Sequence, residues 1–130
     1  MKIILTSVFV NDQDRALEFY TKTLGFVKKS DVSAEGYQWL TVVSPDDLDG
    51  TELLLEPNDN PVAQAYQKGI FEQDIPAASF GVEDTRAEYE RLKAQGVKFT
   101  LEPTEVVAGV TIAVFDDTCG NLIQIQTTPT

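Results

Sequence analysis

The side chains of this chain that could do chemistry are carboxylates, amides and a single thiol. The 130 residues include no histidine, so the commonest general base and the commonest transition-metal ligand are missing. This argues against zinc enzymes and against any catalytic triad that uses histidine. The one cysteine, Cys119, lies in a predicted tight turn, where we expect a structural role. A single cysteine also excludes an intrachain disulfide.

Glu52 and Glu56 form the most obvious pair of carboxylates, four residues apart on one predicted strand. At the rise of a β-strand their β-carbons are about 13 Å apart, too far to act together on one bond. Either could act alone if burial raised its pKa, and with Gln124 and Gln126 they offer oxygen ligands for a hard cation. Because strand ends commonly expose glutamate to water, we predict no catalytic residue and no metal. The acidic segment 46–50 lacks the spacing of a calcium loop and is predicted to be a solvent-exposed turn.

Four aromatic side chains are further candidates for a functional site. Phe9, Tyr37, Trp39 and Phe115 are candidates to line a binding surface, where they would offer stacking and cation-π contacts. For Trp39 the alternative is a place in the core under a helix or in a dimer contact. The formal net charge of -11 repels phosphates and anionic lipids. We therefore predict no nucleic-acid or membrane partner, and expect a neutral or cationic small molecule.

The two halves of the chain repeat one pattern of predicted elements. In each half a strand, two polar residues and an amphipathic helix ending at glycine are followed by three strand-like runs. Asp12 and Asp84 are predicted helix N-caps, and Gly25 and Gly96 predicted helix ends. The expected strands are 3–10, 26–29, 37–43, 52–56, 77–82, 98–101, 110–115 and 122–127, and the expected helices are 13–24, 62–71 and 85–95.

This repeat predicts an α+β fold of two tandem βαβββ modules that form a curved mixed sheet with a central cleft. One domain is expected over residues 1–130, with a first module at about 1–57, a connection at about 58–76 and a second module at about 77–130. Side chains alternate along a strand. The predicted cleft side therefore holds Leu5, Ser7, Phe9, Glu52, Leu54 and Glu56 in the first module, and Ala77 and Gln124 in the second.

These features resemble the vicinal oxygen chelate superfamily, which includes glyoxalase I, extradiol dioxygenases, fosfomycin-resistance enzymes and bleomycin-resistance proteins. The paired modules, the segment from Val10 to Phe26 and the run from Phe115 to Asn121 carry the resemblance. It covers nearly the whole chain. Superfamily members that do chemistry hold a divalent metal at four positions, which correspond here to Leu5, Leu54, Ala77 and Gln124. Three of these side chains have no donor atom, so the resemblance implies a member that has lost its metal ligands.

We therefore predict a metal-independent protein, without a cofactor, that sequesters a cationic or aromatic small molecule. The resemblance to bleomycin-resistance proteins implies a homodimer. The predicted ligand-binding residues are Leu5, Ser7, Phe9, Trp39, Glu52, Leu54, Glu56, Ala77 and Gln124. One alternative is a lyase or other enzyme related to glyoxalase I, and another is a dimeric interaction module that uses its open sheet edges. A short apolar run at the N-terminus and a lone cysteine predict a cytoplasmic protein.

Overall fold

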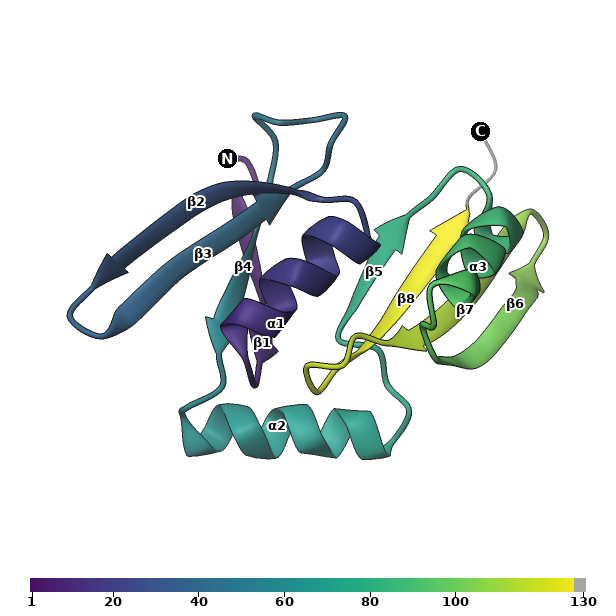
Figure 1. Ribbon diagram of the computed structural model, residues 1–130. Coiled ribbons are helices and arrows are strands. Elements are labelled where there is room, and N and C mark those ends of the chain that lie inside the picture. The colour runs from purple at the N-terminus through teal and green to yellow at the C-terminus, as the bar shows by residue number, and fades with distance from the viewer. Residues whose placement is uncertain (128–130) are drawn as a thin grey trace. The chain divides into compact units, whose positions relative to one another are not determined.

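The computed structural model describes residues 1–127, and its chain divides into two compact units, Met1–Gln64 and Ala65–Thr130. Figure 1 shows that both units contain the same succession of elements. The division falls within helix α2 (Pro61–Glu72), which connects them. The first unit contains β1 (Leu5–Val10), α1 (Gln13–Glu18), the π-helical segment η1 (Phe19–Thr23), β2 (Val27–Ala34), β3 (Tyr37–Val43) and β4 (Glu52–Pro57). The second contains β5 (Ala78–Gly81), α3 (Thr85–Ala94), β6 (Phe99–Val107), β7 (Val110–Asp116) and β8 (Leu122–Thr127).

Each unit is built on one four-stranded mixed sheet. Sheet A has the order β1-β4-β3-β2 and sheet B the order β5-β8-β7-β6. In both, the first strand pairs in parallel with the last, and the other pairs are antiparallel. The predicted α+β fold of two βαβββ modules is confirmed, in the form of two four-stranded sheets. The central cleft and the single domain over 1–130 stay predictions. Within residues 1–127, no helix is long and apolar enough to span a lipid bilayer.

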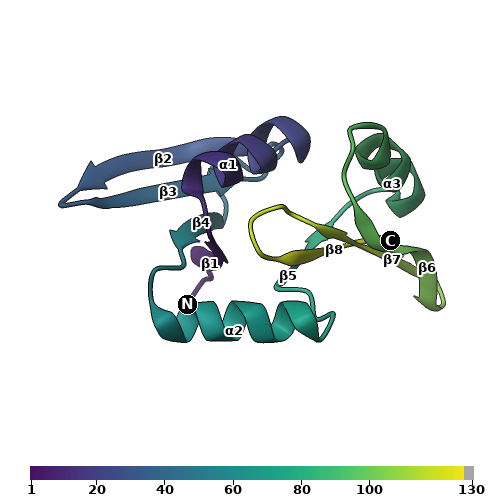
Figure 2. The same ribbon diagram turned by 60° about the horizontal axis from the view of Figure 1, so that its bottom comes forward.

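In each unit, one helix covers one face of the sheet (Figures 1 and 2). In the first unit, the Gln13 side chain ties the start of α1 to the sheet by donating to the carbonyls of Gln38 and Leu55, at 3.0 and 2.9 Å. Alternate residues of the strands form the cores beneath the helices, because every second side chain faces the helix. The buried side chains on these faces include Val8, Val10, Leu40, Val42, Leu53, Leu55, Ala113, Phe115, Ile123 and Ile125.

Phe115 is in the core of the second unit, so the expectation that it lines a binding surface was wrong. It pairs with Ile123 across β7 and β8 and therefore points to the same side of sheet B. Its ring is fully buried and packs edge-on against Phe99, with centroids 5.6 Å apart. Phe99 in turn packs against Tyr89 of α3. The expectation failed because a shift of one residue moves a strand side chain to the opposite face.

The predicted caps begin both helices. The backbone N–H of Arg15 donates to Asp12 Oδ1 at 3.0 Å, and that of Ala87 donates to Asp84 Oδ1 at 3.1 Å. Each carboxylate thus satisfies an N–H group that has no partner inside its helix. Gly25 and Gly96 follow the helices with φ of 93° and 89°, as predicted.

Replacing either cap with alanine is expected to lower the free energy of unfolding by about 1 kcal/mol, because the freed N–H loses its acceptor. Urea denaturation of Asp12→Ala and Asp84→Ala measures this effect. Asp46→Ala, at an exposed position, removes the same charge without removing a cap. An equal loss in Asp46→Ala would contradict the capping explanation.

The first helix ends in a π-helical turn that the sequence pattern does not predict. One more residue separates Asp12 from Gly25 than separates Asp84 from Gly96. The extra residue is taken up in η1, where the Leu24 N–H donates to the Phe19 carbonyl five residues earlier, at 3.0 Å. A π-helical turn of this kind accommodates a single additional residue within a helix. The two helices therefore differ in winding while beginning and ending alike.

Both second strands are longer than predicted, and β2 and β3 form an extended hairpin. Its turn consists of Glu35 and Gly36, with φ of 51° and 78°, which is the pattern of a type I′ turn. The turn before β8 also contains a glycine with a positive φ, Gly120, at 102°.

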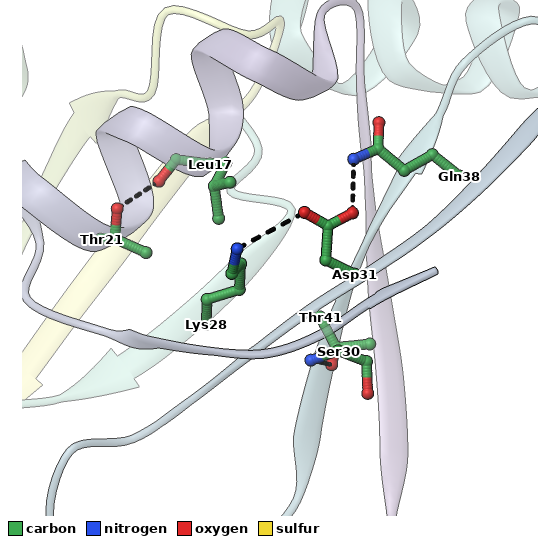
Figure 3. A network of polar contacts seen from close by, with 7 residues as sticks. All are labelled: Leu17, Thr21, Lys28, Ser30, Asp31, Gln38 and Thr41. Carbon is green, nitrogen blue, oxygen red and sulfur yellow. Dashed lines mark hydrogen bonds and ion pairs between the residues drawn. The ribbon is translucent and has the colours of Figure 1, made fainter. Parts of the chain in front are cut away.

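A polar contact on the hairpin joins its two strands (Figure 3). Asp31 accepts a hydrogen bond from Gln38 Nε2 at 2.8 Å, and its other oxygen lies 3.5 Å from Lys28 Nζ. The hydrogen bond from Gln38, followed by the contact with Lys28, lowers the pKa of the Asp31 carboxyl. Asp31 pairs with the buried Leu40 and is therefore on the α1 side of sheet A. The opposite side of the hairpin belongs to the candidate site.

Candidate functional site

The face of sheet A opposite α1, here called far face A, gathers most of the predicted ligand-binding residues. Directly paired residues of neighbouring strands point to the same side of a sheet. The pairing of β1 with β4 places the predicted cleft residues of both strands on one face. The pairs on far face A are Leu5 with Glu52, Ser7 with Leu54, and Phe9 with Glu56.

Trp39 is on the same face. Thr41 of β3 pairs with Leu54, so Trp39 and Tyr37, two and four residues before Thr41, point the same way. The exposed fractions of Trp39 and Tyr37 are 37% and 39%, whereas Leu40, between Trp39 and Thr41, is fully buried on the α1 side. Trp39 is therefore not a core residue under the helix, which removes one of its two alternatives.

Two carboxylates on far face A have different surroundings. Glu52 is held by a short hydrogen bond from Thr41 Oγ1, at 2.6 Å, and Thr41 itself is fully buried and accepts from the Ser30 N–H. Glu56 forms no ion pair with any residue in 1–127. Glu52 is thus held in place by Thr41, whereas the carboxylate of Glu56 has no cationic partner within residues 1–127 and can interact with a positively charged ligand.

The negative charge of Glu56 affects the pKa of the Tyr37 hydroxyl. Its pKa is raised first by desolvation and second by the negative charge of Glu56. Tyr37 and Glu56 are on the same face of sheet A, as the pairing of β1 with β4 and of β3 with β4 shows. Two exposed aromatic rings and a free carboxylate on one sheet face suit a cation with aromatic character, because both the ring faces and the carboxylate attract positive charge.

Ala77 and Gln124 lie in the second unit, on the face of sheet B opposite α3, here called far face B. Gln124 pairs with Ser79 of β5, and Ala77 lies two residues before Ser79. The Ala77 N–H donates to the Leu122 carbonyl at 2.8 Å, which extends the strand pairing to this residue. Both predicted residues thus occupy the face that alternation assigned to them. Whether any of the nine residues binds a ligand stays a prediction.

Thr41 is a buried residue of far face A that holds Glu52, and it was not predicted from the sequence. Its contact with Glu52 depends on the register between β3 and β4, which the sequence does not reveal. The one available signal was its spacing of two residues from Trp39, which places both side chains on one face of a strand.

A buried polar network holds the turn between β7 and β8. Asp117 is fully buried, and its Oδ1 accepts the backbone N–H groups of Cys119 and Asn121 at 2.7 and 3.0 Å. Its Oδ2 accepts Asn121 Nδ2 at 2.8 Å. Gln67 of α2 donates to the Cys119 carbonyl and to Asn121 Oδ1, both at 3.2 Å. Cys119 is itself buried, in keeping with the structural role predicted for it.

A comparison with known protein families identifies the superfamily of this chain. The model of the Glyoxalase/Bleomycin resistance protein/Dioxygenase superfamily matches residues 2–125. The chain belongs to this superfamily. The family resemblance inferred from the helix segment and from the run between Phe115 and Asn121 is therefore confirmed.

Several known proteins are similar to this chain over nearly their full length. The uncharacterized protein YurT of Bacillus subtilis (strain 168) is 65% identical over 125 residues, which cover 96% of this chain and 98% of YurT. The crystal structure of UcmS2 is 33% identical with a TM-score of 0.83, over 97% of both chains. TnmS3, described as an antibiotic binding protein from Streptomyces sp. CB03234, is 26% identical with a TM-score of 0.78, and the match covers 99% of this chain and 97% of TnmS3.

The residues at the metal-binding positions of the superfamily do not fit a divalent cation in this chain. Leu5, Leu54 and Ala77 offer only hydrocarbon. The amide nitrogen of Gln124 is engaged by Ser79 and Gln126, at 3.1 and 3.2 Å. One neutral amide oxygen is a poor donor set for an ion that needs several charged or imidazole ligands. These four residues therefore do not fit a catalytic divalent metal ion.

Proposed function

We propose that this superfamily member binds a small aromatic cation on far face A and sequesters it unchanged. The observation that carries the proposal is that Tyr37 and Trp39 share far face A with the carboxylate of Glu56, which has no ion-pair partner within residues 1–127. A cation placed over these rings gains from their π-electrons and from the carboxylate, and the partly desolvated surface strengthens both attractions.

The apolar residues of far face A complete the proposed surface. Leu5 and Phe9 offer contact area for the uncharged part of a ligand, Leu54 is buried between them and the neighbouring strand, and Ser7 and Glu52 offer polar edges. The net charge of -11 favours the approach of cations over long distances. The antibiotic-binding description of TnmS3, a relative over nearly its full length, supports small-molecule binding as the class of function. The proposed binding requires no metal and no cofactor.

Ethidium, a planar phenanthridinium cation, is a suitable probe. Its fluorescence anisotropy in a titration with the full chain is expected to give saturable binding of one site, with a Kd below about 100 μM. The anion 8-anilinonaphthalene-1-sulfonate, of similar apolar area, is expected to bind at least about tenfold more weakly. Equal affinity for both dyes, or no saturation with ethidium, would overturn the proposal.

Metal analysis tests the alternative of an enzyme related to glyoxalase I. Equilibrium dialysis of the purified chain against Zn²⁺, Ni²⁺ and Mg²⁺ is expected to leave less than stoichiometric metal on the protein. A single ion bound with micromolar affinity or better would favour the enzyme.

We also propose that the chain is a cytoplasmic homodimer, as its resemblance to bleomycin-resistance proteins implies. Sedimentation velocity at micromolar concentration tests the assembly, and a monodisperse monomer would contradict it. Thermal unfolding with and without ethidium separates a binding protein from a pure interaction module, because only a ligand that binds the folded state stabilises it.

A further inference from the structure

Far face B carries a hydrogen-bonded trio of neutral polar side chains. Gln124 Nε2 donates to Ser79 Oγ at 3.1 Å and to Gln126 Oε1 at 3.2 Å. Ser79 Oγ lies 3.4 Å from the same Gln126 oxygen. These contacts fix both glutamine amides side by side at the surface, since Gln124 and Gln126 are two residues apart on β8 and point the same way.

One hydrogen-bond acceptor and one donor group of the trio are not used by its internal hydrogen bonds. Both hydrogens of Gln124 Nε2 are engaged, so its Oε1 remains as an acceptor. Gln126 Oε1 is engaged, so its NH₂ group remains as a donor. If both amides are flipped, the unused groups are the Gln124 NH₂ and the Gln126 carbonyl, so one donor group and one acceptor still remain. Within residues 1–127, no side-chain polar atom is buried without a partner, so both unused groups are accessible to solvent.

The surroundings of the trio are apolar and uncharged. Val114 pairs with Gln124, and Ile112 pairs with Gln126 on β7. On β5, Gly81 pairs with Gln126, and a β-carbon built on Gly81 would meet no atom within 4 Å. No charged residue occupies these paired positions. Val114 is almost completely buried, so a flat ligand group finds aliphatic contact at the partly exposed Ile112 and open space above the glycine.

We infer that far face B recognises a neutral carboxamide or lactam group. Such a group carries an N–H donor and a carbonyl acceptor side by side, and these match the free Gln124 carbonyl and the free Gln126 NH₂. The absence of charge at the paired positions favours a neutral ligand group, in contrast to far face A. The inference goes beyond the proposed function, because it concerns the other sheet and a neutral ligand group.

Benzamide and acetophenone test the inference on the unmodified protein. They share ring and carbonyl, but acetophenone has a methyl group in place of the amide NH₂. Titrations are followed by the ¹⁵N–¹H signals of the Gln124 and Gln126 side chains. We expect benzamide to shift both signals and to bind about fivefold or more tightly than acetophenone, since one hydrogen bond is worth about 1 kcal/mol. Equal affinity for the two probes, or shifts confined to other residues, would overturn the inference.

Gln126→Glu gives a second test with a gain of binding. The substitution keeps the oxygen that accepts from Gln124 but replaces the free donor with an acceptor. The variant is expected to lose the preference for benzamide and to bind benzamidinium, a donor-only cation, at far face B. Gln73→Glu is the matched control, because Gln73 is exposed and the charge change is the same. A gain for benzamidinium as large in Gln73→Glu would contradict the assignment.

Ethidium anisotropy on the same samples separates this inference from the proposed function. Ethidium binding without discrimination between benzamide and acetophenone would refute only the carboxamide site on sheet B. Discrimination without ethidium binding would refute the proposed cation surface on sheet A and leave the carboxamide site standing.

Discussion

Replacing Asp117 with alanine is expected to destabilise the second unit by about 3 kcal/mol, because three hydrogen-bond donors lose their acceptor. The carboxylate is fully buried and accepts from two backbone N–H groups and from Asn121 Nδ2. In Asp117→Ala these donors stay buried without a partner or must open the turn to water. Urea denaturation followed by circular dichroism measures the loss.

A pair of substitutions tests that hydrogen bonding is the cause. Asp117→Asn alone keeps one acceptor oxygen but sets its NH₂ against the NH₂ of Asn121, and is expected to cost about 1.5 kcal/mol. Adding Asn121→Asp restores the match, because the carboxylate introduced by this second substitution accepts from the new amide and from Gln67. The double variant is therefore expected to be more stable than Asp117→Asn. A double variant that is less stable would contradict this network, and Asp46→Ala controls for the loss of a surface carboxylate.

Alternation and local caps determine the parts of the fold that could be predicted from the sequence. β3 and β8 have the predicted bounds, and Asp12 and Asp84 cap their helices as expected. These features depend on residues close together in the chain. The extra length of β2 and β6 was not predicted, because edge strands carry polar residues on both faces and lose the alternating pattern.

The parts of the site that were predicted depend on residues close together in the chain, and the parts that were missed depend on how distant strands pair. Leu5, Glu52 and their strand neighbours were assigned to one face by alternation alone, and strand pairing places them together. The hydrogen bond from Thr41 to Glu52 depends on how β3 and β4 align, which is a non-local property. The wrong assignment of Phe115 has the same origin, since the face of β7 is decided by its partner strands.

Truncating the ring of Trp39 is expected to have the largest effect on ligand binding. Trp39→Ala removes stacking and cation-π contact worth about 2 kcal/mol together, so the Kd for ethidium is expected to rise about 30-fold. Anisotropy of the dye reports this without relying on protein fluorescence, which matters because Trp39 is the only tryptophan. Val107→Ala, which truncates an apolar side chain that is 62% exposed in β6, is expected to leave the Kd unchanged.

Removing the charge of Glu56 separates local attraction from the general acidity of the chain. Glu56→Gln is expected to raise the Kd for ethidium about fivefold, because the residue is half-buried and shares far face A with Tyr37 and Trp39. Glu83→Gln, at an exposed position, changes the net charge equally and is expected to have little effect. Raising the salt concentration should weaken binding in the native chain more than in Glu56→Gln. Equal losses in the two glutamine variants would mean that bulk charge, rather than far face A, attracts the cation.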